Sequence, residues 1–237
     1  MRDGPPGCQF SGYRACVDRL ARIYGKLRRA YGHGGWWPSS SGFEVCVGAI
    51  LTQNTAWTNV ERTLRGLRRR RLLSFRALNE LSASQLAPLL RASGTFRVKA
   101  RRVRAFLDLL GRQYGGRVAR MAQEDPMRLR ERLLGVHGIG PETADAIALY
   151  AAGHAFFVVD AYTRRVLERA GLLRGGESYD AVQSLFHRRL PRNAALFNDY
   201  HAQLVRLAKE ACRKVPLCTK CPIETLCEKR GVAEVRA

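Results

Sequence analysis

The spacing of the apolar residues limits the fold of this chain more than any other feature, because it follows the α-helical period. Val103, Phe106, Leu107 and Leu110 lie three or four residues apart on one helix face, and residues 129–134 and 182–186 behave alike. Glycine-rich breaks separate these segments, and alternating runs of period two are rare. The apolar residues 156–159 are too isolated to build a sheet. The sequence therefore predicts an all-α protein of about ten helices.

Charge is the first indication of a partner. The 237 residues carry a formal net charge of +21, and such a field attracts polyanions, which favours nucleic-acid binding. An arginine-rich codon usage is an alternative source of part of the excess. The four arginines at residues 68–71 follow a predicted helix that begins near Asn59. They form either a solvated helix end or a contact with phosphate.

Other sequence features bear on location. Residues 1–7 are rich in Gly and Pro and lack the apolar region of a signal peptide. No stretch approaches the ~18 apolar residues that a membrane span needs. We therefore expect a cytoplasmic, nucleoid-associated protein that does not enter a membrane and acts as a monomer.

A glycine-rich turn lies between two predicted helices at residues 134–144. Gly138 and Gly140 flank Ile139, and Pro141 opens the next helix. The glycines permit unusual backbone dihedrals and close approach of another backbone, while Ile139 is expected to plug into the core. Unpaired amides at the new helix start would then bind one phosphate oxygen. An ordinary turn between helices is the alternative.

Residues 138–165, GIGPETADAIALYAAGHAFFVVDAYTRR, resemble the helix-hairpin-helix DNA glycosylases of the endonuclease III superfamily. In that family a Val-Asp pair follows the hairpin by about twenty residues, and here it is Val159-Asp160. The segment FEVCVGAILTQNTAWTN is similar to an early helix and its Gln-containing loop. The resemblance covers roughly residues 36–230 and implies a double-stranded DNA substrate whose damaged base is flipped out.

Asp160 has two compatible interpretations. It precedes the predicted helix 161–170 and suits an N-cap. The family resemblance implies that it is also the catalytic carboxylate. Breaking a base–sugar bond builds positive charge on the sugar, which a carboxylate stabilises while it orients the attacking water.

A lysine is missing where the bifunctional family members carry one, two residues after the second hairpin glycine. Glu142 occupies that position, and no lysine occurs between Lys99 and Lys209. A carboxylate cannot form a Schiff base, so the sequence predicts a monofunctional glycosylase. Glu142 itself either lines the base pocket or is a first-turn acid.

Two features bear on the base. Gly48 stands where the adenine-mismatch branch places a glutamate, which counts against that branch. Trp36, Trp37, Pro38 and Trp57 are similar to the 3-methyladenine glycosylase III branch, whose aromatics stack on the flipped base. A methylated purine is cationic and binds aromatic faces. Filling of the core is the alternative for these tryptophans.

The remaining DNA contacts are implied by the resemblance. Gln53 is expected to fill the gap left by the extruded base, with a helix-capping amide as its alternative. Thr95 and Phe96 are candidates for an opposing wedge, in a loop that leads to Lys99. Lys99 is counted with them as a DNA-binding residue.

Four of the seven cysteines gather near the C-terminus, with five, two and five residues between them: Cys212, Cys218, Cys221 and Cys227. Four such thiolates suit either zinc or a [4Fe–4S] cluster. The family resemblance favours the cluster, although its first gap is one residue longer. The cluster would present Arg213, Lys214 and Lys220 to phosphates, unless these cations are merely solvated.

We expect two helical domains: residues 42–152 with the hairpin, and residues 8–41 plus 153–237 with the cluster. The main alternative activity is a bifunctional, endonuclease III-like lyase acting on oxidised pyrimidines. A uracil or thymine mismatch glycosylase and a non-enzymatic DNA-binding module are the others.

Overall fold

The computed structural model describes the backbone of residues 13–34, 39 and 41–232, with side chains from Arg19 onward. Eleven α-helices and several short 3₁₀ turns make up the regular structure of these residues, which include no strand. The prediction of an all-α fold is confirmed. No helix among the described residues has the length and apolar character to cross a membrane.

The chain divides into two compact units. One contains the described residues of 1–36 and 156–237, and the other contains those of 37–155. We call them the split unit and the hairpin unit. The division into domains at residues 42–152 and at residues 8–41 plus 153–237 stays a prediction.

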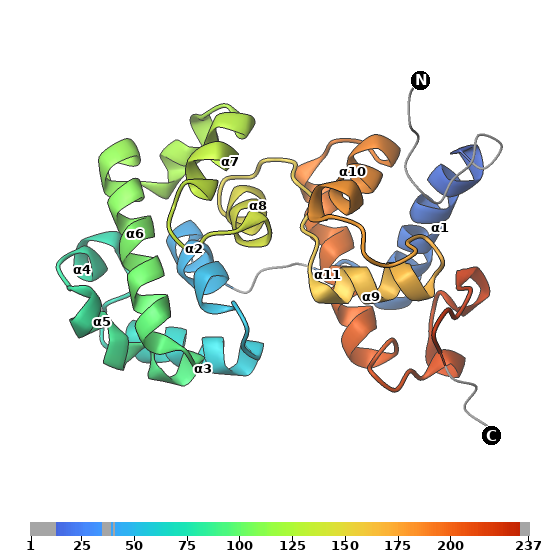
Figure 1. Cartoon of the computed structure of the whole chain (residues 1–237), viewed down its shortest axis with the longest axis horizontal. Helices are drawn as coiled ribbons and strands as arrows, with labels where there is room; N and C mark the ends of the chain where they lie inside the picture. Colours follow the sequence, from blue (N-terminus) through green and yellow to red (C-terminus); the bar gives the residue numbers. More distant parts are fainter. Residues whose placement is uncertain (1–12, 35–38, 40, 233–237) are drawn as a thin grey trace. The chain divides into compact units, whose positions relative to one another are not determined.

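The hairpin unit is a bundle around two short apolar helices (Figure 1). Nearly every residue of α2 (Gly42–Leu51) is buried, and α8 (Pro141–Tyr150) is buried from Thr143 to Leu149. Around them lie α3 (Trp57–Arg69), α4 (Phe75–Asn79), α5 (Ala83–Leu89), α6 (Phe96–Tyr114) and α7 (Pro126–Leu134). Helices that are apolar on all sides belong inside a bundle, because they have no face to offer to water.

Local sequence signals set several helix starts in this unit. Ser41, Ser74 and Ser82 each cap a helix by accepting an N–H three residues on, and Ser82 completes a capping box with Gln85. Asp125 caps α7, and Pro126 occupies its first turn, as the Asp-Pro pair predicts.

One of the four clustered arginines is structural, because Arg68 forms an ion pair with the buried Glu44 at 2.5 Å.

The split unit is built on α11 (Ala194–Glu210), with α1 (Tyr13–Tyr31), α9 (Ala161–Arg169) and α10 (Tyr179–Arg189) against it. Its core is aromatic. Phe157 stacks on Phe186 with centroids 3.5 Å apart and meets the edges of Phe197 and Tyr200. The apolar residues 156–159 are therefore a buried extended segment without a sheet, and they deliver Asp160 to the start of α9.

Candidate functional site

The two glycines of the hairpin differ in conformation. Gly138 has a φ of 80°, a left-handed conformation that favours glycine, and an added Cβ would lie 2.4 Å from Arg102 Nε. Gly140 has an ordinary φ of −94°, so the prediction of an unusual dihedral there is wrong. Gly140 is the N-cap of α8 and open space lies in front of it. Ile139 between them is 5% exposed and plugs into the core as predicted.

The two helices that flank the hairpin are held together by a buried ion pair. Arg130 of α7 donates to both carboxylate oxygens of Asp145 of α8, at 2.7 and 3.3 Å. Asp145 is completely buried. Because its N-cap residue is a glycine, the start of α8 has no side-chain cap.

Gln53 supports the hairpin from behind. Its Nε2 donates to the Gly138 carbonyl at 3.0 Å and to Thr143 Oγ1 at 2.9 Å, while Oε1 accepts from Arg102. The amide is thus fully engaged inside the hairpin unit and is not a free probe of the DNA stack. The expectation that Gln53 fills the gap left by an extruded base is corrected to this extent: its amide is bonded within the hairpin unit.

Its neighbour Asn54 has the features that Gln53 lacks. Asn54 is exposed and has a φ of 53°, which turns the chain at the tip of the loop after α2. Thr95, at the start of α6, is likewise exposed with a φ of 32°, and Phe96 follows it half-buried. In the sequence, one signal indicated Asn54: it directly follows Gln53, which matches the glutamine of the family.

The prediction that Lys99 contacts DNA is wrong, because its side chain is completely buried. The ammonium donates to the carbonyls of Leu51, at 2.8 Å, and Ser93, at 2.5 Å. These carbonyls end α2 and precede the Thr95 turn, so Lys99 joins the two loops that carry Asn54 and Thr95. Burial, followed by the charge of Arg102, lowers the pKa of Lys99 to about 8.

Asp160 caps α9 in the split unit. Its Oδ1 accepts the Thr163 N–H at 2.7 Å, so the N-cap interpretation is correct. Burial by itself raises the pKa of Asp160, but His201 and the Thr163 N–H outweigh burial and bring that pKa below its usual range. The carboxyl group is therefore ionised at neutral pH, although only 17% of its side chain is exposed.

His201 is a neighbour of Asp160 that the sequence did not reveal. Its Nε2 lies 3.5 Å from Asp160 Oδ2, and its side chain is nearly buried in the middle of α11. The two residues are 41 positions apart and share no motif. Only the packing of α9 on α11 joins them.

The predicted base-pocket residues are described only in part. Glu142 is exposed in the first turn of α8, and Trp57 is half-buried at the first position of α3. One side of Trp57 lines a cavity of about 110 Å³ together with charged residues of α2 and α3. Trp36, Trp37 and Pro38 lie outside the described residues.

The four clustered cysteines follow α11 and lie on a loop with two 3₁₀ turns, η4 (Cys218–Lys220) and η5 (Glu224–Leu226). Burial, followed by the charges of Cys212, Cys227 and Cys218, raises the pKa of Cys221 to about 11. Within the part of the chain that the structure describes, no three His, Cys, Asp or Glu side chains stand ready to hold a metal ion.

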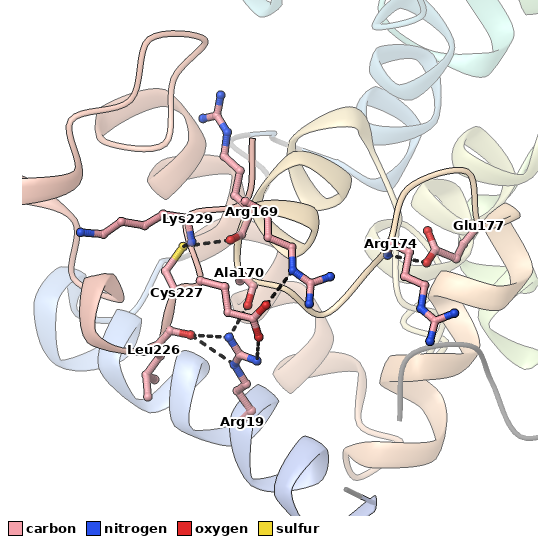
Figure 2. A network of polar contacts seen from close by, with 10 residues as sticks. Arg19, Arg169, Ala170, Arg174, Glu177, Leu226, Cys227 and Lys229 are labelled. Atoms are coloured by element: carbon pink, nitrogen blue, oxygen red, sulfur yellow. Dashed lines mark hydrogen bonds and ion pairs between the residues drawn. The ribbon is translucent and has the colours of Figure 1, made fainter. Parts of the chain in front are cut away.

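Two arginines tie this loop to the end of α9, and Figure 2 shows the contacts of the first, Arg19. Arg19 of α1 donates to the Leu226 carbonyl at 2.8 Å, to Glu228, and to the Ala170 carbonyl. Arg169 donates to Cys212 Sγ at 3.4 Å and to the carbonyls of residues 213 and 214. The loop is thereby fixed by backbone contacts that leave the side chains of Arg213 and Lys214 exposed.

Comparisons with known proteins agree with this arrangement. Residues 47–192 match the HhH-GPD superfamily base excision DNA repair protein family. A protein of Methanocaldococcus jannaschii named as a DNA repair glycosylase is 39% identical over 212 residues, which cover 89% of this chain and 96% of that protein. Endonuclease III of Thermotoga maritima is 28% identical and covers 82% of this chain, with 87% of its own length matched.

Solved structures show the same fold. The H. pylori 3-methyladenine DNA glycosylase bound to 1,N6-ethenoadenine superposes with a TM-score of 0.70 at 27% identity, covering 82% of this chain and 97% of that one. A trapped endonuclease III–DNA covalent intermediate superposes with a TM-score of 0.77 at 20% identity, covering 90% and 96%. The chain belongs to the HhH-GPD superfamily of base excision DNA repair proteins and is a DNA glycosylase of that superfamily.

Proposed function

We propose that this glycosylase is monofunctional and excises an alkylated purine such as 3-methyladenine, with Asp160 as its catalytic carboxylate. The observation that carries the proposal is the place of Asp160, whose largely buried carboxylate caps α9 and accepts the Thr163 N–H at 2.7 Å. A carboxylate in a site of low dielectric acts strongly on nearby positive charge.

The chemistry follows from that charge. The target nucleotide leaves the stack, because its glycosidic bond is out of reach within a duplex. As the C1′–N bond breaks, its electron pair goes to the base and positive charge grows on the sugar, where the carboxylate stabilises it. Water then bonds to C1′ and gives up a proton to the solvent. A cationic alkylpurine leaves as a neutral base, so no separate acid is needed.

The distribution of lysines supports the absence of a strand-cutting step. Glu142 stands where a Schiff-base lysine would be, and the only lysine of the hairpin unit is Lys99. Lys99 is buried and donates to two carbonyls, so it is not available to attack a sugar. An abasic site is therefore the expected product, rather than a nick.

The choice of an alkylated purine rests on aromatic residues and on one relative. Trp57 is partly exposed at the start of α3, and Trp36, Trp37 and Pro38 complete the aromatic set of the sequence. Tryptophan faces attract cationic rings. The H. pylori structure, 27% identical, is of a 3-methyladenine glycosylase with a modified adenine bound.

Binding to double-stranded DNA is divided among several elements in this proposal. The uncapped amides after Gly138, Ile139 and Gly140 bind a phosphate, and the exposed Arg213 and Lys214 bind others. Asn54, rather than Gln53, fills the gap left by the flipped base, with Thr95 opposite. The protein acts as a monomer.

A [4Fe–4S] cluster is the cofactor that we propose, with zinc as the alternative. Cys212, Cys218, Cys221 and Cys227 would hold it, as the family resemblance implies, on a loop that Arg19 and Arg169 already fix. When bound, such a cluster supplies four metal–thiolate bonds that cross-link the loop. Elemental analysis tests this assignment: the cluster gives iron and inorganic sulfide in equal amounts, about four per chain, whereas a zinc site gives one zinc.

The decisive experiment is a mass-spectrometric screen for bases released from alkylated, deaminated and oxidised DNA, paired with borohydride trapping. We expect release of methylated purines and no trapped covalent complex. Asp160→Asn should abolish release while DNA binding persists. Release of uracil or thymine without any alkylpurine would contradict the substrate assignment, and a borohydride adduct would support the lyase alternative. If the protein releases no base and Asp160→Asn leaves its DNA binding unchanged, a non-enzymatic DNA-binding module is favoured.

A further inference from the structure

The carboxylate of Asp160 has a neighbour at each of its oxygen atoms. Oδ1 accepts the Thr163 N–H at 2.7 Å, and Oδ2 faces His201 Nε2 at 3.5 Å. The Thr163 contact belongs to the helix cap and would form with any N-cap Asp. The His201 contact has no part in capping, and it lies at the other oxygen.

His201 is itself fixed by its surroundings. It is 5% exposed on α11, the helix that packs most extensively against α9. Its ring meets the face of Phe157 at 78°, with centroids 6.3 Å apart. Phe157 is completely buried in the aromatic core, three residues before Asp160. The imidazole thus lies between the aromatic core and the Asp160 carboxylate and contacts both.

We propose that His201 is a positioning residue for catalysis: its Nε2–H holds Oδ2 and fixes the plane in which Asp160 presents its charge to the sugar. The proposal rests on the catalytic role proposed above for Asp160. An imidazole Nε2–H is a donor that suits a carboxylate oxygen. A distance of 3.5 Å suits a contact that tightens when substrate binds.

The alternative is that His201 only fills the core, and stability measurements alone do not separate the two. The separating measurement is affinity for two abasic-site DNA duplexes. One contains a pyrrolidine ring that carries the positive charge of the transition state, and the other contains a neutral tetrahydrofuran. The ratio of their dissociation constants reports how well the Asp160 charge is directed at the sugar, whereas general loss of fold or DNA contact lowers both affinities together.

Four variants of the full-length protein complete the test. His201→Leu removes the donor, and we expect it to narrow the preference for the cationic duplex by about tenfold or more, as for a hydrogen bond to a charged group. His201→Gln carries an amide that reaches the place of Nε2 and should keep most of the preference. Asp160→Asn should abolish it. His33→Gln alters another imidazole of the split unit, which is 69% exposed and faces Asp199 instead of Asp160, and should leave the ratio unchanged.

The outcomes separate this inference from the proposed function. If Asp160→Asn abolishes the preference and His201→Leu does not change it, the role of His201 is refuted and that of Asp160 stands. If Asp160→Asn keeps the full preference, the catalytic role of Asp160 is refuted, and the inference with it. Should His201→Leu fail to fold, His201→Asn replaces it: its shorter amide misses Oδ2, so a ratio equal to that of His201→Gln would overturn the proposal.

Discussion

Gly138 illustrates how one residue fixes the hairpin. Its φ of 80° and the close Arg102 side chain both exclude a Cβ. We predict that Gly138→Ala lowers the free energy of unfolding by at least the ~1–2 kcal/mol that a left-handed residue costs. Urea unfolding at neutral pH measures the change. Unaltered stability would mean that the turn relaxes freely, against the tight contact with Arg102.

Gly140 serves as the matched control, because its glycine is not needed for conformation. Its φ is ordinary and an added methyl group meets open space. We predict that Gly140→Ala leaves stability within ~0.5 kcal/mol of the parent. It should nevertheless weaken DNA binding, since the methyl group projects where a phosphate would approach the uncapped amides. Parental DNA affinity, measured by fluorescence anisotropy, would argue against the hairpin as the phosphate site.

Single residues also show where the sequence was sufficient. The family resemblance assigned roles to Asp160 and Glu142, because both lie at matching distances from the hairpin. It also placed Lys99 beside the Thr95 loop as a DNA contact, yet the Lys99 side chain is buried and donates to the carbonyls of Leu51 and Ser93. His201 depends on a contact between two helices and has no local signature.

At the scale of elements, Lys99 joins the loop after α2 to the turn before α6. Its pKa of about 8 in the folded protein lies below the ordinary 10.5, so the unfolded chain binds more protons between these pH values. The contribution of Lys99 to the free energy of unfolding therefore rises as the pH rises from about 8 toward 10.5. That contribution is lost as the pH falls back to 8.

Lys99→Met should remove this pH dependence. We predict that the difference in unfolding free energy between parent and variant grows by about 2 kcal/mol from pH 7.5 to 9.5. Urea titrations at both pH values measure it, and groups common to both proteins cancel in the difference. Lys99→Arg, which stays charged throughout, should lack the rise as well. If the difference in unfolding free energy between parent and Lys99→Met were the same at both pH values, the pKa of Lys99 would not be lowered. Its ammonium would then be in contact with water.

Helix boundaries in this fold were predictable where the signal is local. Asp125-Pro126 and Ser178 each mark a helix start that the structure contains. The role of residues 156–159 was not predictable, because a short apolar run has the same pattern in a strand and in a buried connection. Only the aromatic packing around Phe157 makes it the segment that delivers Asp160.

At the scale of the whole molecule, the net charge of +21 is the balance of 41 basic and 20 acidic residues, and the basic residues do not share one role. Arg19, Arg130 and Arg169 act inside the protein, on carbonyls, carboxylates and a thiol. Composition alone predicted a polyanion partner but not which cations meet it. Exposure in the structure narrows the choice for the cysteine loop to the residues around Arg213 and Lys214.

The salt dependence of DNA binding measures how many of these cations contact phosphate. Each contact releases condensed counterions, so the slope of log affinity against log salt falls by about one for every cation removed. We predict that the double variant Arg213→Gln, Lys214→Gln lowers the slope by about two, with base specificity unchanged. Arg22→Gln with Arg29→Gln removes the same charge from exposed positions of α1 and should change the slope less. Equal slopes in the two double variants would show that net charge alone governs binding and that the cysteine loop presents no specific phosphate contact.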